Sequence, residues 1–548
     1  MNTAHIALPK EKLAFWVDKM GDSDVLFQPI NRQVETYTWK DISDQAYRMV
    51  GFLKAQGYQP GDTIAILAKN CAHWIIADFA LMLGGFVSVP IYPTANQETI
   101  SYILEHSECK AIFLGKLDDL SAAENAVPDH ILKIAMPYET IPCDHQWQSI
   151  IDSNEPDYDV PEVKEDDLMT ILYTSGSTGN PKGAMHSYKS FVLAGKNTGA
   201  SIQITPEDRI LSYLPMSHCT ERNYVCSIFI NWGFQVYFVE SLATFAEDLA
   251  FAKPTLFGSV PRLWTQFQKK ILQKIPNNKL QFILKVPVLN KIVSKKIRKQ
   301  MGLDKANAFI SGSAPISRKL LEWYRGIGID IAEGWGMTET FACGSMPKKN
   351  KEVRFGTISQ PSFEVDIKIA EDDEILVRCT SNMMGYFKED EKTKEALNGD
   401  GYIHTGDLGK LEDGYLTITG RKKDIFKTEK GKYVAPIPIE SDFGENEYIE
   451  LMCLVGTQLV QPVLLVNLSD HAKGLPKDEL NASLGDSLNK INQKLESHEK
   501  VGGILVVESP WTTESGVLTP TLKVKRHVVE ERYLDLAKDV SHGQVVWH

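Results

Sequence analysis

Apolar residues in the first quarter of the chain follow two alternating spacings. Segments with apolar positions three to four residues apart alternate with short continuous apolar runs. The first spacing predicts amphipathic helices, and the second predicts buried strands. The alternation predicts a mostly parallel sheet with helices on both faces. The expected order is helix 39–56, strand 63–68, helix 71–83, strand 86–91, helix 99–108 and strand 111–114.

The same alternation returns after an acidic connector at 155–167. A large N-terminal part built from two similar α/β halves is therefore expected. Strands are predicted at 169–172, 210–214, 235–239, 255–258 and 308–310, with helices from Tyr188 onward and at 316–325.

The pattern changes character between 363 and 419. Short β-type runs at 365–369, 374–378 and 415–419 are separated by turn dipeptides such as Asp400-Gly401 and Asp413-Gly414. This arrangement predicts a small β-rich subdomain. A further α+β unit is expected from about 425 to 548. The predicted fold class is therefore α/β, with a smaller α+β unit at the C-terminal end.

Composition excludes several classes of function. The 548 residues are 43% hydrophobic and 24% charged, which is ordinary for a globular protein. A net charge of −12 argues against general nucleic-acid binding, since phosphate backbones favour clustered positive charge. No run of 18 apolar residues and no secretory signal is present, and the eight cysteines form no C-x-x-C pair. We therefore expect a cytoplasmic protein with reduced thiols and without a transmembrane segment.

The stretch richest in candidate chemistry lies between strand 169–172 and the helix expected from Tyr188. Its glycines leave backbone N–H groups open, its hydroxyl groups add donors, and Lys182 adds a positive charge, as in a phosphate-binding loop. The alternative is a flexible linker, but linkers seldom place Pro-Lys-Gly directly after a hydroxyl-rich run. The spacing does not fit the Walker loop of NTPases. The stretch reads Tyr173-Thr174-Ser175-Gly176-Ser177-Thr178-Gly179-Asn180-Pro181-Lys182-Gly183.

This loop resembles the signature loop of the adenylate-forming superfamily, which includes acyl- and aryl-CoA synthetases, peptide-synthetase adenylation domains and firefly luciferase. The resemblance implies that the loop holds the β- and γ-phosphates of ATP. Six motifs occur in the superfamily's order between about Thr38 and Arg526. These motifs extend the resemblance over nearly the whole chain. The chain is most similar to bacterial long-chain fatty acyl-CoA synthetases.

The motif at 214–222, Leu-Pro-Met-Ser-His-Cys-Thr-Glu-Arg, resembles the wall of the superfamily's acyl site. The resemblance implies that His218 contacts the carboxylate or the adenylate. A lone histidine at a strand end is otherwise a satisfied structural residue. Some long-chain members carry a tryptophan gate where this chain has Arg222, so the sequence departs from that gating pattern.

Two further motifs resemble the adenine and α-phosphate site. Small residues at 311–315 would let adenine approach the main chain. In the segment 333–340, the resemblance implies that Trp335 stacks on adenine, Thr338 contacts the α-phosphate and Glu339 binds Mg²⁺ together with Thr174. By itself, an acidic residue after a threonine is usually only solvated. The nucleotide-binding residues expected here are Gly312, Ser313, Ala314, Glu333, Gly334, Trp335 and Gly336.

The remaining motifs lie toward the C-terminus. The resemblance implies that Asp407 binds the ribose hydroxyls with help from Arg421, and that Lys423 is the hinge about which the C-terminal unit turns. Gly431 would line the pantetheine tunnel after that rotation, and Lys523 would be the adenylation lysine. Without the resemblance, these residues would be taken for a charged loop and a solvated terminal lysine. The implied domains are 1–420, a hinge at 421–424, and a mobile unit at 425–548.

The implied function is ATP-dependent activation of a fatty acid, with long-chain acids favoured, to an acyl-adenylate. Transfer to coenzyme A would then give acyl-CoA, AMP and pyrophosphate, with Mg²⁺ as the metal. Open alternatives are an adenylating enzyme that feeds a carrier protein or uses a medium-chain or aryl acid, a luciferase-like oxidase, and a non-catalytic lipid-binding protein.

One segment stands apart from the motifs. Residues 269–299 contain nine lysines and Arg298 but no acidic residue, and apolar residues are interleaved with them. Two interpretations remain open. The segment is a solvated basic face, or it binds anionic lipid at a membrane surface from which an acyl substrate is drawn.

Overall fold

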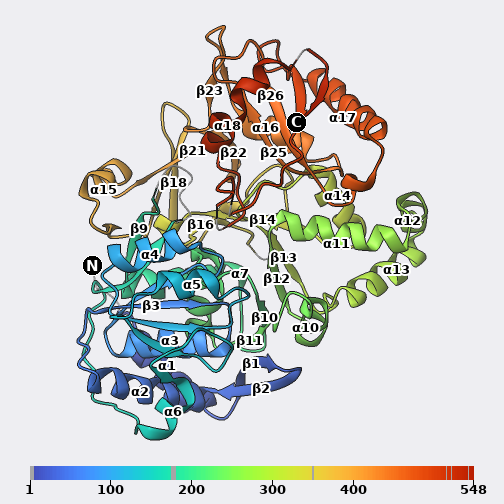
Figure 1. Ribbon diagram of the computed structural model, residues 1–548. Helices are drawn as coiled ribbons and strands as arrows, with labels where there is room; N and C mark the ends of the chain where they lie inside the picture. The colour runs from blue at the N-terminus through green and yellow to red at the C-terminus, as the bar shows by residue number, and fades with distance from the viewer. Residues whose placement is uncertain (1–4, 175–179, 349–350, 514, 520, 541) are drawn as a thin grey trace.

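The computed structural model describes residues 5–174, 180–348, 351–513, 515–519, 521–540 and 542–548 (Figure 1). An eight-stranded sheet forms the centre of the N-terminal part, in the order β20-β9-β8-β4-β3-β5-β6-β7. The strands from β8 to β7 are parallel, whereas β9 pairs antiparallel with both β8 and β20. Their bounds are β3 (Thr63–Ala68), β4 (Val87–Ile91), β5 (Ala111–Gly115), β6 (Leu132–Ala135), β7 (His145–Gln146), β8 (Leu168–Tyr173), β9 (Gly183–Ser187) and β20 (Gly385–Tyr386).

Helices cover both faces of this sheet, as the apolar spacing predicts. Ile64 and Ile66 of β3 join one core cluster with α2 and α3, whereas Ala65 and Leu67 join a second cluster with α4. Alternate residues of a strand point to opposite faces of the sheet, so β3 contributes side chains to the core on both faces. The flanking helices include α1 (Pro9–Met20), α2 (Trp39–Ala55), α3 (Ala72–Leu83), α4 (Gln97–His106), α5 (Ser121–Ala126), α6 (Trp147–Ser153) and α7 (Tyr188–Ile202).

The phosphate-loop candidate does not lead directly into a helix. The strand β9 lies between the loop and α7 and pairs antiparallel with β8. Thr174 N donates to Lys182 O at 2.9 Å, which closes the hairpin. The sequence expectation of a strand–loop–helix junction is therefore wrong. The candidates Ser175, Gly176, Ser177, Thr178 and Gly179 lie outside the described residues.

The second α/β half holds two smaller sheets. One has the order β10-β11-β1-β2, so the N-terminal strands β1 and β2 complete a sheet that otherwise uses residues beyond 200. The other has the parallel order β12-β13-β14. The strand bounds are β1 (Asp24–Ile30), β2 (Gln33–Thr38), β10 (Arg209–Ser212), β11 (Gln235–Phe238), β12 (Leu256–Ser259), β13 (Ala308–Ser311) and β14 (Ile331–Glu333). The helices are α8 (Cys219–Glu221), the π-helix η1 (Arg222–Ser227), α9 (Ile228–Trp232), α10 (Phe245–Ala252), α11 (Pro261–Lys274), α12 (Asn277–Leu284), α13 (Pro287–Gln300) and α14 (Arg318–Gly326).

The expected β-rich subdomain is present as a four-stranded antiparallel sheet in the order β18-β19-β21-β22. Short elements join it to the second half and to the central sheet. Its strands are β18 (Val365–Ile369), β19 (Glu374–Cys379), β21 (Ile403–Glu412) and β22 (Tyr415–Arg421). The joining elements are β15 (Trp335–Gly336), η2 (Thr338–Thr340), β16 (Gly344–Met346), β17 (Gln360–Pro361) and α15 (Asp390–Ala396).

The C-terminal unit has its own sheet, β25-β26-β27-β28, and two core clusters on its two faces. It sits above the N-terminal part in Figure 1. A large α/β part with a smaller α+β unit is the predicted fold class, which is confirmed. The elements are β23 (Phe426–Lys427), β24 (Tyr433–Val434), α16 (Pro436–Phe443), β25 (Ile449–Val455), β26 (Val463–Leu468), η3 (Ala472–Gly474), α17 (Lys477–Asn492), β27 (Gly503–Val506), α18 (Arg526–Lys538) and β28 (Val545–Trp547).

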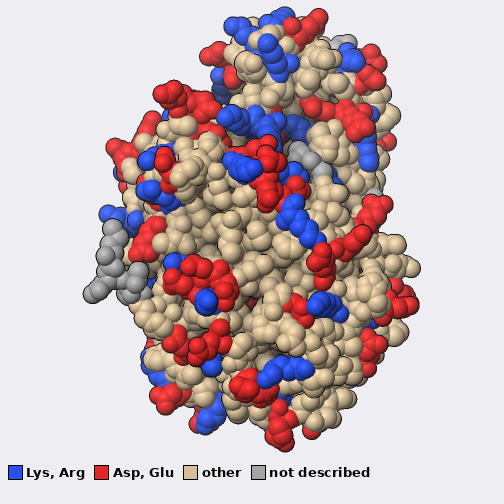
Figure 2. Space-filling view, turned by 90° about the vertical axis from the view of Figure 1, so that its left-hand side faces the viewer, with Lys and Arg blue, Asp and Glu red and all other residues tan. Residues whose placement is uncertain are grey.

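Charged side chains are mixed on much of the surface. Figure 2 shows acidic and basic residues interspersed on the face that lies on the left of Figure 1. Among the described residues, no helix is both long and apolar enough to cross a bilayer.

Candidate active site

Glu339, Tyr386 and Lys182 meet beside the phosphate-loop candidate, although they come from distant parts of the chain. The Tyr386 hydroxyl donates to Glu339 Oε1 at 2.5 Å. Lys182 Nζ lies 4.1 Å from the centre of the Tyr386 ring. Burial raises the pKa of Tyr386, so the phenol stays protonated and remains a donor. Tyr386 therefore contacts a carboxylate through its hydroxyl and a cation through its ring.

Asp407 links the β-rich sheet to the adenine-site motif. Its Oδ2 accepts a hydrogen bond from Trp335 Nε1 at 2.9 Å, and its Oδ1 lies 3.1 Å from Arg421 Nε. Asp407 and Arg421 are direct partners in the β21–β22 register, which places their side chains together. Burial raises the pKa of Asp407, and the Arg421 charge opposes that rise. The indole and guanidinium thus fix the orientation of this carboxylate.

His218 begins α8 at the end of the loop that follows β10. Its Nδ1 accepts the backbone N–H of Thr220 at 3.2 Å, so the proton of the neutral ring lies on Nε2. Burial lowers the pKa of His218 to about 3, and Lys523 adds a smaller effect in the same direction. At neutral pH His218 is therefore an uncharged hydrogen-bond donor. Thr338 is near, since its hydroxyl donates to Cys219 Sγ at 3.7 Å.

Lys523 extends from the C-terminal unit to these residues. The surrounding protein lowers the pKa of Lys523, and the positive charge of Arg421 lowers it further, whereas Cys219 and Asp407 raise it. The charge of Lys523 therefore acts on Asp407 and Arg421, and it disfavours protonation of His218. Lys523 is exposed to solvent.

A tight turn presents Lys523. Thr519 N donates to Lys523 O at 2.8 Å, and Lys523 N donates to Thr519 Oγ1 at 3.1 Å. Between them, Leu522 takes a left-handed backbone with φ of 60°. Leu518 and Val524 then pair as an isolated antiparallel bridge. The backbone of Lys523 is therefore held by hydrogen bonds to the backbone and the side chain of Thr519.

Several cations gather here and repel one another. Burial lowers the pKa of Lys182, Glu339 raises it, and Lys423 and Lys392 lower it. The charge of the hinge candidate Lys423 thus acts on the phosphate-loop lysine. Because like charges disfavour each other in a partly buried site, a bound polyanion would relieve this repulsion.

The small residues of the adenine-site candidate face each other across β13 and β14. A Cβ on Gly312 would come within 3.3 Å of Gly334 O, and Gly334 N donates to Ser311 O at 2.8 Å. A Cβ on Gly336 would clash with Ala342 O at 2.4 Å. Ser313 and Ala314 are exposed. Burial raises the pKa of Glu333 to about 7. The segment therefore offers bare main chain beside the half-buried Trp335.

Gly431 is not brought to this site. It is exposed in the turn between β23 and β24, where its N–H donates to Thr428 O at 2.9 Å with a φ of 78°. Figure 1 shows β23 near the top of the C-terminal unit, away from β14 and β16. Its expected place in a tunnel would require the unit to turn.

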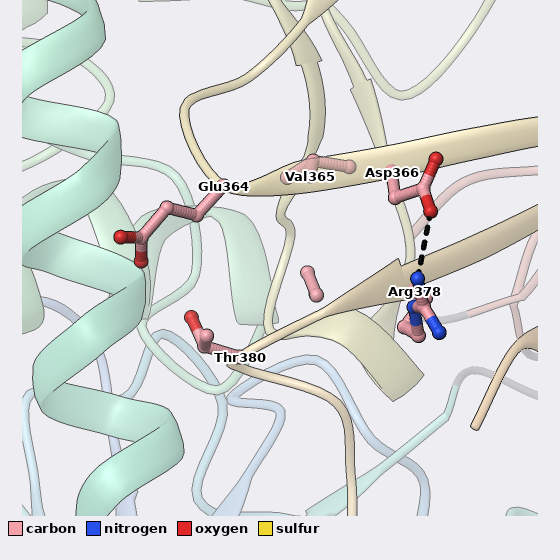
Figure 3. A pocket seen from close by; sticks show the side chains of 6 residues that line it. Glu364, Val365, Asp366, Arg378 and Thr380 are labelled. Carbon is pink, nitrogen blue, oxygen red and sulfur yellow. Dashed lines mark hydrogen bonds and ion pairs between the residues drawn. The ribbon is translucent and has the colours of Figure 1, made fainter. Parts of the chain in front are cut away.

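A surface hollow elsewhere does not belong to the candidate site. Side chains from β18 and β19 line it, and Figure 3 shows Glu364 and Thr380 on one side with the Asp366–Arg378 pair on the other. Asn197 already donates to Glu364 Oε2 at 3.0 Å, and Arg378 pairs with Asp366 at 3.0 Å. These polar groups are therefore engaged within the protein.

Comparison with known proteins shows the family. The AMP-binding enzyme family matches residues 13–387, and the AMP-binding enzyme C-terminal domain matches residues 423–542. The chain belongs to the AMP-binding enzyme family. The resemblance seen in the sequence is confirmed.

Relatives of this AMP-binding enzyme include fatty acyl-CoA synthetase A of Dictyostelium discoideum, 29% identical over 91% of this chain and 85% of that protein. Long-chain-fatty-acid--CoA ligase FadD15 of Mycobacterium tuberculosis is 28% identical over 87% of each chain. Among solved structures, the adenylation domain of the carboxylate reductase from Mycobacterium chelonae has a TM-score of 0.82 at 21% identity, covering 97% of this chain and 91% of its own. The Mycobacterium tuberculosis fatty acyl CoA synthetase has a TM-score of 0.67 at 20% identity, covering 96% and 99%. These structural likenesses establish the fold.

Three residues that were not among the predicted site residues support the site. One is Tyr386, described above. The others are Glu221 and Asn70, which organise the loop before His218. Glu221 Oε1 accepts from Ser212 Oγ at 2.9 Å and Tyr213 N at 3.0 Å. Asn70 Oδ1 accepts from Met216 N at 3.2 Å. Glu221 lies within the motif at 214–222, whereas no local pattern marks Asn70 or Tyr386, because their contacts join separate strands.

Arg222 is buried and points away from the residues proposed to bind substrate. It pairs with Asp78 at 2.7 Å, donates to Ser88 Oγ at 2.8 Å and lies over the Trp74 ring. The side chain is fully inaccessible to solvent. In this structure Arg222 ties η1 to α3 and β4, which is a packing role.

Proposed function

We propose that the protein converts a fatty acid, ATP and coenzyme A into acyl-CoA, AMP and pyrophosphate, with long-chain acids as the preferred substrates. The names of the relatives support fatty acids as the substrate class. The observation that carries the proposal is the Asp407 carboxylate, which Trp335 Nε1 and Arg421 Nε hold at 2.9 and 3.1 Å and on which the charge of Lys523 of the C-terminal unit acts.

The adenosine of ATP would lie beside Trp335. The indole supplies a π face, and the bare main chain of Gly312, Ser313, Ala314, Gly334 and Gly336 allows close approach. Asp407 is held by Trp335 and Arg421 with its oxygens directed by those bonds. A carboxylate can accept both hydrogen bonds of a vicinal diol, so Asp407 would bind the ribose. Glu333, with its raised pKa, would face the base.

The phosphates would occupy the region where the cations gather. Lys182 and the loop from Thr174 would bind the β- and γ-phosphates, and Thr338 would contact the α-phosphate. In the first half-reaction a carboxylate oxygen of the fatty acid attacks the α-phosphorus, and the bond to pyrophosphate breaks. Lys523 would oppose the negative charge that grows on the phosphoryl oxygens. No general base is needed, because the acid is ionised at neutral pH.

Mg²⁺ fits the chemistry of Glu339 and Thr174. Glu339 is a hard oxygen donor whose Oε1 is oriented by Tyr386, and the described residues supply no further partner for Oε2. Within the described residues no cluster of three or more His, Cys, Asp or Glu side chains forms a metal cage. One carboxylate with substrate phosphates is a common arrangement for Mg²⁺, which would neutralise phosphate charge when bound.

The second half-reaction requires a different arrangement. The thiolate of coenzyme A attacks the acyl carbonyl, and AMP leaves. Turning about Lys423 would withdraw Lys523 and bring the segment around Gly431 to the acyl-adenylate. The hinge would thus divide a domain of residues 1–420 from a mobile domain of residues 425–548. One site would then serve both steps.

A pyrophosphate-release screen tests this proposal. Carboxylic acids of graded length are supplied with ATP, with and without coenzyme A, and the nucleotide and acyl products are identified. We expect AMP, acid-dependent pyrophosphate, and thioester only when coenzyme A is present, with the highest kcat/KM for long-chain acids. Release of ADP would overturn the proposal. Pyrophosphate without any thioester would instead identify an enzyme that feeds a carrier protein.

We also propose that the reaction takes place in the cytoplasm. All eight cysteines are free thiols, and six of them are buried. This supports a reducing compartment.

A further inference from the structure

The helices α12 and α13 expose apolar side chains that core helices would bury. Phe282 is 71% exposed, Val288 68% and Ile292 60%, and Val286 and Leu289 are also exposed. These five residues fall within eleven positions of the chain, whereas the other exposed large apolar residues of the described chain are scattered. We define Phe282, Val286, Val288, Leu289 and Ile292 as the apolar patch. Its clustering indicates a surface that is covered by something else.

Lysines share the face of α13 that carries the patch. Val288, Ile292, Lys295 and Lys299 recur every three to four residues, so they project from one side of the helix. The opposite side carries Asn290, Ser294 and Ile297, which are half-buried or buried. The outer face is thus apolar toward its N-terminal end and basic toward its C-terminal end.

The positive charge of this region is not neutralised within the protein. Six lysines lie in residues 277–300, and none of them forms an ion pair with any described residue. The segment contains no acidic residue, in a chain whose net charge is −12. The face shown in Figure 2, on the opposite side of the molecule, instead mixes acidic and basic side chains. The six lysines are Lys279, Lys285, Lys291, Lys295, Lys296 and Lys299.

Charge and shape together define the partner. A lipid bilayer with anionic headgroups offers negative charge at its surface and an apolar layer just beneath it. In Figure 1, α12 and α13 extend from the right-hand side of the molecule, where they can meet a flat surface. A helical peptide partner would need a groove for its apolar face, whereas these side chains lie on exposed helices that extend from the molecule (Figure 1).

We propose that the outer face of α12 and α13 docks on membranes rich in anionic lipid, with the apolar patch inserted and the lysines at the headgroups. The α11 helix connects this face to β12. At Gly258 of β12, the space that a Cβ atom would fill is open. This inference deepens the proposed function, since fatty acids partition into bilayers and would be drawn from there. Docking itself requires neither ATP nor turnover.

Flotation of the full-length protein with lipid vesicles tests the proposal. Vesicles of phosphatidylcholine alone are compared with vesicles containing phosphatidylglycerol, at low and high salt and without ATP. We expect binding to the anionic vesicles that falls steeply with salt. The triple variant Lys291→Glu, Lys295→Glu and Lys299→Glu should bind at least a hundredfold more weakly, because each lysine contributes about fivefold.

Matched controls separate this surface from net charge and hydrophobicity. Lys10→Glu, Lys410→Glu and Lys494→Glu together make the same change in charge at exposed sites elsewhere, and this variant should lose far less binding. Val288→Ser with Ile292→Ser should weaken binding, whereas Leu242→Ser, at an 87% exposed position, should not. All variants should retain pyrophosphate release with a dissolved short-chain acid, so a docking failure is distinguishable from a failure of the proposed reaction.

Three outcomes would overturn the proposal. They are equal binding to neutral and anionic vesicles, no binding to either, and equal losses in the triple variant and its control. A concentration-dependent dimer that the Val288→Ser and Ile292→Ser variant abolishes would show that the patch joins two copies of the chain instead.

Discussion

Trp335 donates its indole N–H to Asp407 at 2.9 Å, so the residue proposed to stack on adenine also orients the carboxylate proposed to hold the ribose. The two residues come from different sheets, β15 and β21. One hydrogen bond therefore couples the two halves of the nucleoside site. Loss of the indole N–H should therefore weaken binding of the ribose, even if the aromatic ring remains.

Trp335→Phe should raise the KM for ATP at least about tenfold with little change in kcat, because one hydrogen bond to a charged carboxylate contributes about 1.5–3 kcal/mol. Asp407→Ala should raise it on the order of a hundredfold. Acid-dependent pyrophosphate exchange at varied ATP measures both. Trp323→Phe is the matched control, since Trp323 Nε1 is buried without a hydrogen-bond partner in the described part of the chain. An unchanged KM in Trp335→Phe would contradict the coupling.

Lys523→Ala should slow acyl-adenylate formation by a hundredfold or more, on the order of what one preorganised charge contributes in a transition state. Thioester formation from a supplied acyl-adenylate should be largely spared, because the proposed rotation removes Lys523 from that step. Single-turnover assays of each half-reaction measure the two rates. Lys525→Ala, two residues further along, should affect neither half-reaction.

Lys423→Pro should impair the second half-reaction more than the first. Proline fixes φ near −65°, so the backbone at the proposed hinge can no longer turn freely. The same two single-turnover assays apply, with coenzyme A supplied in excess. Equal loss of both steps in Lys423→Pro and in Lys523→Ala would contradict a rotating unit.

Ion pairs join the two units in the observed arrangement. Arg262 of α11 lies 2.7 Å from Glu450, and Lys319 of α14 lies 2.5 Å from Glu445. Because this arrangement also places Lys523 at the site, the pairs should favour the adenylation step. Exposed pairs contribute about 0.2–1 kcal/mol each, so Glu450→Arg should slow the first half-reaction by at most about fivefold.

The charge swap Arg262→Glu with Glu450→Arg should restore the rate of the first half-reaction. The effect of Glu450→Arg should also shrink at high salt, where exposed pairs are screened. Arg318→Glu serves as a control, because Arg318 pairs within its own helix with Glu322. If high salt leaves the deficit of Glu450→Arg unaltered, the ion pair is not its cause.

The sequence predicted the elements whose signal is local. Strand 63–68 and helix 39–56 follow from apolar spacing, and the structure has β3 at Thr63–Ala68 and α2 at Trp39–Ala55. By contrast, β9 reads Gly-Ala-Met-His-Ser, which has neither strong strand propensity nor regular alternation. It becomes a strand because β8 and β20 flank it.

The site shows the same division between local and distant signals. Motifs placed Lys182, Trp335, Asp407 and Lys523 on the candidate list, and in the structure Trp335 donates to Asp407, on which the charge of Lys523 also acts. Tyr386 lies far along the chain from Lys182, and only the pairing of β20 with β9 brings the two together. Contacts of this kind depend on sheet order, which no single segment of sequence encodes.

His186 makes stability sensitive to acid. It is fully buried on β9, where Nε2 lies 2.8 Å from Thr338 O, so the neutral ring donates this bond. Burial lowers its pKa to about 3. The unfolded chain, with a histidine pKa near 6.5, binds more protons between these values. Stability should therefore fall as the pH drops below about 6.5, until the pH reaches about 3.

Near pH 5.5 the loss from this one residue should be about 1.2 kcal/mol per pH unit. His186→Gln keeps an N–H donor for Thr338 O and cannot titrate, so its free energy of unfolding should depend less steeply on pH by that amount. Urea unfolding between pH 7 and pH 5 measures the slopes. His130→Gln, at an exposed position, is the control and should leave the slope unaltered. Identical slopes in the parent protein and in His186→Gln would show that the buried ring is not the residue that takes up the proton on unfolding.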